Sequence, residues 1–114
     1  MAQPGVAEFA AEFVRAIASG ESGAAHDLLS VEMAASVTFA DLSSRFQALA
    51  DDMGGVTGIG QPMVILEQWP DMSENDRALV YVALEGDSFS EAITVAVAEI
   101  DGRFRVSSIE WGRP

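Results

Sequence analysis

The sequence predicts an α+β fold, in which helices from the first half of the chain pack on an antiparallel sheet formed by the second half. Apolar residues recur at helical spacing up to residue 53, whereas long runs of β-forming residues broken by tight turns follow residue 60. A chain of 114 residues can bury one hydrophobic core but not two. We therefore expect a single domain over residues 1–114.

The first expected helix covers residues 4–19. Pro4 suits its first turn, where the missing N–H is harmless, and Gly20 is a natural C-terminal stop. Its apolar side chains form one stripe on the helix: Val6, Phe9, Ala10, Phe13, Val14 and Ile17. A second helix is expected over residues 22–29, with Ser22 as its N-cap.

A short helical turn, capped by Ser30, is expected up to about Ser36. A longer third helix is predicted over residues 38–53, because Thr38 and Asp41 have the spacing of a capping box. An apolar stripe follows from this start, and a pair of glycines directly after the stripe ends the helix.

Antiparallel strands are expected near residues 63–69, 77–86, 88–100 and 103–112. Asp101-Gly102 is a strong two-residue hairpin signal, so the last three strands form a meander with the first at its side. The two middle strands are apolar on both faces, whereas a solvated face would carry polar residues at alternate positions. One face therefore meets the helices, and the other needs a cover.

Composition excludes several classes of function. The net charge is −12, with 18 acidic residues against 6 arginines and no lysine, which argues against nucleic acid or an anionic membrane as partner. Without cysteine or lysine and with one histidine, the usual nucleophile, Schiff-base, phosphate-loop and zinc-ligand sets cannot be assembled. We expect no metal and no cofactor. The start of the chain has no secretory pattern and no stretch is apolar enough to span a membrane, so a cytoplasmic location is expected.

The order of helix stops and strand turns resembles the cystatin-like cone fold of the nuclear-transport-factor-2-like (NTF2-like) superfamily. The likeness covers nearly the whole chain and is carried by "FVRAIASG", "LLSVEM", "MGGV" and "DGRFRV", none of which is a chemical motif. It is similar in particular to small bacterial members without an established function. The resemblance implies a cone-shaped cavity between the helices and the concave sheet, and dimerisation through the sheet. It leaves the activity open, because isomerases, dehydratases, cyclases and binding modules share the fold.

Three short motifs approach functional loops without matching them. Residues 58–60 begin like a dinucleotide loop, but Met63 replaces the third glycine, so a linker turn is expected. The run Asp71, Ser73 and Asn75 begins like a calcium loop, but Asp76 stands where that loop needs glycine and Val82 where it needs the closing glutamate, so a solvated hairpin loop is expected. Residues 86–88 resemble a serine-hydrolase block, but turn chemistry explains them.

Candidate residues for a ligand pocket come from the titratable groups. His26 is either an ordinary helix histidine or a proton-transfer or donor group that lines the cone. Glu67 and Glu99 neighbour apolar strand residues, and a carboxylate in an apolar cavity can gain a raised pKa and move a proton. Strand ends and edges explain these glutamates equally well.

Two aromatic residues complete the candidates. Tyr81 either packs in the sheet or assists a carboxylate, and Trp111 is expected at a cavity mouth or an interface, where its indole N–H stays wet. No residue is assigned a catalytic role. Two functions remain open: a non-catalytic module for ligand binding or assembly, and a cofactor-free isomerase- or dehydratase-like enzyme acting on a small apolar substrate. In either case we expect a homodimer that buries the second sheet face.

Overall fold

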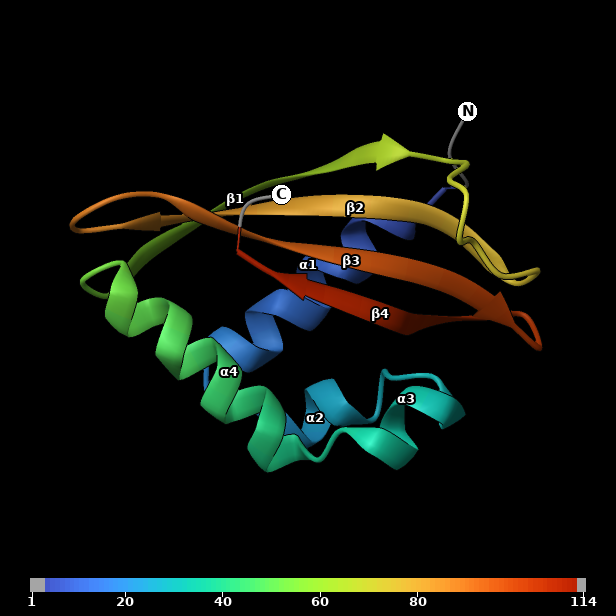
Figure 1. Cartoon of the computed structure of the whole chain (residues 1–114), viewed down its shortest axis with the longest axis horizontal. Coiled ribbons are helices and arrows are strands. Elements are labelled where there is room, and N and C mark those ends of the chain that lie inside the picture. Colours follow the sequence, from blue (N-terminus) through green and yellow to red (C-terminus); the bar gives the residue numbers. More distant parts are fainter. Residues whose placement is uncertain (1–3, 113–114) are drawn as a thin grey trace.

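The computed structural model describes residues 4–112; residues 1–3 and 113–114 of the expected domain lie outside the described residues. Helices come first and strands follow, which confirms the α+β class. The elements are α1 (Val6–Ala18), α2 (Ser22–His26), α3 (Val31–Ser36), α4 (Phe39–Asp52), β1 (Val56–Leu66), β2 (Asp76–Gly86), β3 (Glu91–Ile100) and β4 (Arg103–Trp111). All four helices lie on the same side of a curved sheet (Figure 1).

Helix α1 is the central helix under the sheet, and it contacts all four strands. Its predicted apolar stripe is buried except at Phe9, which is half-buried. Gly20, at φ 84°, ends the helix as expected, and the N–H of Glu21 donates to the carbonyl of Ala16 over 2.8 Å. The prediction for Pro4 was wrong, because Gly5 is the N-cap and Pro4 precedes the helix.

Helix α2 is shorter than predicted and ends at His26. Its expected last turn instead pairs with β4: the N–H of Val106 donates to the carbonyl of Leu28 and the N–H of Ser30 to the carbonyl of Val106, both over 2.8 Å. The expected cap was also wrong, because Ser22 is the first helical residue and forms no cap hydrogen bond.

The starts of α3 and α4 confirm the predicted caps. The Ser30 hydroxyl accepts from the N–H of Met33 over 3.2 Å. At α4, the Thr38 hydroxyl accepts from the N–H of Asp41 over 3.0 Å, and the Asp41 carboxylate accepts from the N–H of Thr38 over 2.9 Å. These bonds satisfy backbone donors that the first turn of a helix leaves free. Gly54 and the next glycine, both with positive φ, end α4.

The sheet has the strand order β1-β2-β3-β4, and every neighbouring pair is antiparallel. The β3–β4 hairpin turns at Asp101 and Gly102, both with positive φ, as its sequence predicts. The first strand therefore flanks the predicted meander.

Two strands differ from their predicted bounds. β1 covers residues 56–66 and thus includes residues 58–60, so the expected linker turn was wrong: Ile59 pairs with Leu84 of β2. β3 starts at Glu91, because the preceding residues contact the end of α4, where the N–H of Ser88 donates to the carbonyl of Met53 over 2.8 Å.

The outer face of the sheet points away from the helices. At β3, the side chains on this face are buried by their neighbours within the same chain. Ala92, Thr94, Ala96 and Ala98 are at most 3% exposed in this chain alone. These side chains are short, and cross-strand neighbours such as Leu79 and Tyr81 flank them. Apolar exposure gathers instead on the flanking strand β1, at Met63 (56%), Ile65 (39%) and Leu66 (45%).

Candidate functional site

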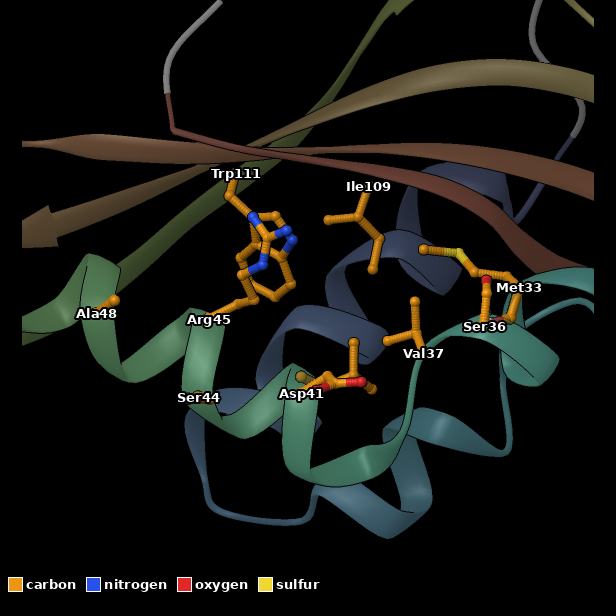
Figure 2. Close-up of a pocket in the computed structure, with 10 residues that line it drawn as sticks. Met33, Ser36, Val37, Asp41, Ser44, Arg45, Ala48, Ile109 and Trp111 are labelled. Carbon is orange, nitrogen blue, oxygen red and sulfur yellow. Dashed lines mark hydrogen bonds between the residues drawn. The ribbon is translucent and has the colours of Figure 1, made fainter.

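A pocket of about 640 Å³ opens between α3, α4 and the inner face of β4 (Figure 2). Its volume is in the range of small-molecule sites. The residues around it come from both halves of the chain: Met33, Ser36, Val37, Asp41, Leu42, Ser44, Arg45, Ala48, Ile109 and Trp111.

Local sequence patterns explain why these side chains meet. The capping box fixes the start of α4, and helical spacing then places Asp41, Arg45 and Ala48 on one face, three or four residues apart. Ile109 and Trp111 are two residues apart on β4, so both point from the sheet toward α4. Figure 2 shows Arg45 extending from α4 toward the sheet, opposite Trp111.

The pocket has an apolar side and a polar side. Met33, Val37 and Ile109 supply apolar surface, whereas Ser44 and Arg45 supply hydrogen-bond donors from α4. Such a combination, a mostly apolar wall with a few polar groups that orient the occupant, is typical of ligand sites.

Asp41 is the one carboxylate among the described residues that line the pocket. Hydrogen bonds from the backbone and side chain of Thr38 hold the pKa of Asp41 below its ordinary value of 3.8, with a smaller contribution from the charge of Arg45. The carboxyl group is therefore ionised at neutral pH and serves as a helix cap. It does not fit the role of a proton donor.

The structure brings one of the five predicted pocket residues, Trp111, into this pocket. His26 is half-buried beside it, where Nε2–H donates to the carbonyl of Val37 over 2.7 Å and ties α2 to the segment before α4. Tyr81 pairs with Thr94 on the outer face, so the sheet separates it from the pocket.

The two predicted glutamates lie at sheet ends. Glu67 directly follows β1, and Oε1 of Glu99 lies 3.6 Å from Nε of Arg77 near the β3–β4 hairpin. Both therefore occupy the strand-end positions that the sequence offered as the other explanation. Neither lines the pocket.

Sequence reasoning missed Arg45 and Ile109. The available signal was weak: Arg45 lies four residues after the capping Asp41, beside the apolar stripe of the same helix, and Ile109 shares the strand face of Trp111. Nothing in the local sequence says that these two faces meet.

Two further properties concern the described part of the chain. Within residues 4–112, no three histidine, aspartate or glutamate side chains lie close enough together to hold a metal ion. No helix in that range is long and apolar enough to cross a membrane.

Comparison with known proteins places the fold. No family model and no curated protein matches the chain. A search of solved structures found a crystal structure from Campylobacter jejuni described as a "Putative NTF2-like transpeptidase", with a TM-score of 0.61 and 17% identity over 89% of this chain and 95% of that chain. Likeness at this identity concerns the fold alone, and it confirms the NTF2-like fold that the sequence resemblance implied.

Proposed function

We propose that this chain, which has an NTF2-like fold, is a non-catalytic module that binds a small, largely apolar ligand in the pocket between α4 and β4. The observation that carries the proposal is the lining: among the described residues it consists of apolar walls and two ionisable groups, Arg45 and Asp41. Arginine stays protonated in proteins, and Asp41 is engaged as a helix cap. Neither group suits a proton-transfer step, so the pocket fits retention of a ligand better than its conversion.

Catalysis is the alternative, because the Campylobacter protein is described as a "Putative NTF2-like transpeptidase". A cofactor-free isomerase or dehydratase would need a carboxyl group with a raised pKa in the pocket, whereas the pKa of Asp41 is lowered. Acyl transfer would need an activated nucleophile. Ser36 and Ser44 are the hydroxyls of the pocket, and His26 is not among its lining residues. These features favour binding.

The test blocks the pocket with one bulky side chain. Ala48 lines the pocket, whereas Ala40 is exposed on the same helix outside it, so Ala48→Phe and Ala40→Phe form a matched pair. The probe is 2-naphthamide. Its binding is measured by calorimetry and by the shift of the NMR signal of the Trp111 indole N–H. The variant Trp69→Phe, which retains Trp111 as its tryptophan, assigns that signal.

Binding to the wild-type chain and to Ala40→Phe, with at least tenfold weaker binding to Ala48→Phe, is the expected result. The Trp111 signal should shift only where binding occurs. Equal binding to all three proteins would contradict the proposed site, and so would a wild-type chain that binds neither 2-naphthamide nor 2-naphthoate.

We also propose that the chain forms a homodimer through the outer face of the sheet. Met63 and Leu66 are exposed there, and the hydroxyl of Thr94, buried at the centre of the face, has no hydrogen-bond partner among the described residues. A stable interface of standard size buries about 800 Å² on each partner. A second copy would cover these apolar side chains with a self-complementary surface.

Light scattering at tens of micromolar protein tests the dimer. Met63→Arg places a charge on the exposed part of the outer face and should give a monomer with an unchanged circular dichroism spectrum. Ser43→Arg, on the exposed side of α4, should leave the dimer intact. A monomer mass for the wild-type chain would refute this proposal.

A further inference from the structure

We propose that the ligand of this pocket carries a single carboxylate, which Arg45 binds while an apolar body lies against Met33, Val37 and Ile109. This inference rests on the proposed function, because it assigns a chemical class to the occupant of the same pocket. The inference is based on the hydrogen-bonding groups of the pocket, where more donors than acceptors are left without a partner in the fold.

Arg45 is exposed, and among the described residues it forms no hydrogen bond and no ion pair. Its charge does interact with the carboxylate of Asp41, but that carboxylate is already held by Thr38 as the helix cap. Other arginines form direct polar contacts or lie among several acidic residues. Arg77 bonds two backbone carbonyls and lies 3.6 Å from Glu99, and Arg105 bonds the carbonyl of Phe104. Arg15 lines a different groove together with three acidic residues. The guanidinium of Arg45 is therefore available to an acceptor from outside the chain.

The remaining polar groups of the pocket favour the same kind of ligand. The carboxylate of Asp41 already accepts from the backbone of Thr38. The side chains of Ser44 and Trp111 have no hydrogen-bond partner among the described residues, and the indole N–H of Trp111 can only donate. Donors thus outnumber free acceptors, which favours a ligand that brings acceptor oxygens.

The geometry of the Arg45 guanidinium and the net charge of the chain further restrict the chemical class of the ligand. A guanidinium presents a planar fork that matches the two oxygens of a carboxylate. The net charge of −12 repels an anion in proportion to its charge, and a single arginine does not offset the second charge of a phosphate monoester. The apolar wall requires an apolar body. A flat or unbranched monocarboxylate meets all three conditions.

Calorimetry with matched probes tests the inference on the full chain. The probes share one ring system and differ in charge: 2-naphthoate, 2-naphthamide, 2-naphthyl phosphate and 2-naphthylmethylammonium. Arg45→Gln removes the proposed partner, and Arg103→Gln removes an exposed arginine of the β3–β4 hairpin, so both variants change the net charge equally. Circular dichroism checks that each variant is folded.

The wild-type chain should bind 2-naphthoate at least tenfold more tightly than the other three probes. Arg45→Gln should weaken 2-naphthoate about tenfold and change 2-naphthamide less than twofold, whereas Arg103→Gln should change neither. Added salt should weaken the binding of 2-naphthoate and leave the binding of neutral 2-naphthamide unchanged.

The possible failures are distinguishable. If 2-naphthamide binds and is blocked by Ala48→Phe, but 2-naphthoate binds no more tightly or is insensitive to Arg45→Gln, the carboxylate inference is wrong and the pocket stands. Tighter binding of the phosphate or the ammonium probe also overturns the inference. If no probe binds the wild-type chain, both proposals fail.

Discussion

Gly86, at the end of β2, lies against Met53, the C-cap residue of α4. A Cβ atom at this position would lie 2.6 Å from the carbonyl oxygen of Phe89 and 2.8 Å and 2.9 Å from Cβ and Cε of Met53. The first two atoms belong to the backbone or lie one bond from it, so they cannot move without moving the chain. Gly86→Ala should therefore push the end of α4 away from the sheet.

The expected loss of stability follows from these contacts. Forcing an extra methyl group into a packed site costs about 1–3 kcal/mol, and three contacts below 3.0 Å place Gly86→Ala near the upper end, at about 3 kcal/mol. The melting temperature should fall by about 10 °C. Gly23→Ala is the matched control, because a Cβ there meets nothing within 4 Å and α2 backbone suits alanine. It should stabilise the chain by about 0.5 kcal/mol.

Urea unfolding of the two variants, with melting followed by circular dichroism, measures both effects. The Trp111 signal in Gly86→Ala should also shift, since α4 forms one wall of the pocket. A loss below 1 kcal/mol for Gly86→Ala, or equal effects of the two substitutions, would refute the close approach.

Three further predictions concern other contacts. The lowered pKa of Asp41 means that its ionised form stabilises the fold above pH 3.8 and that this contribution disappears as the pH falls through the lower folded-state pKa. The melting-temperature difference between wild-type and Asp41→Asn should therefore shrink in acid, and a constant difference would contradict the assignment. Leu84 is fully buried, so Leu84→Ala should cost about 3 kcal/mol in urea unfolding; a loss under 1 kcal/mol would contradict its core position. Oδ1 of buried Asp76 accepts from the Ser107 hydroxyl over 2.7 Å, and Oδ2 accepts from the Ser73 N–H over 2.8 Å. Ser107→Ala should cost about 1–2 kcal/mol and speed glutamyl-endopeptidase cleavage in the loop before β2, whereas unchanged cleavage would count against this anchor.

Features that depend on a few consecutive residues could be predicted directly. The capping box of α4 needs Thr38 and Asp41 alone, and the β3–β4 turn needs Asp101 and Gly102 alone. The helical stripe of α1 and the strand order of the meander also follow from spacing and short connections. The fold class could therefore be predicted before any contact was known.

Features that depend on residues far apart in the sequence could not be predicted in this way. Helix α2 ends early because β4 competes for the backbone of residues 28–30, and β1 starts early because β2 pairs with it. A partner strand is absent from any local window of sequence, so local patterns predict a helical turn and a linker instead.

The candidate site shows the same division. Alternation along β2 and β4 determines that Tyr81 and Val82 point to opposite faces and that Ile109 and Trp111 share one, but it does not say which face meets the helices. Packing decides that, by burying Val82 in the core and leaving Tyr81 on the outer face. The pocket needs Arg45 and Trp111 on facing elements, a juxtaposition that forms only when α4 docks against β4. The sequence thus determined which side chains are available on each face of a helix or strand. The free energy of burying one face of each element decided which of these side chains meet in the pocket.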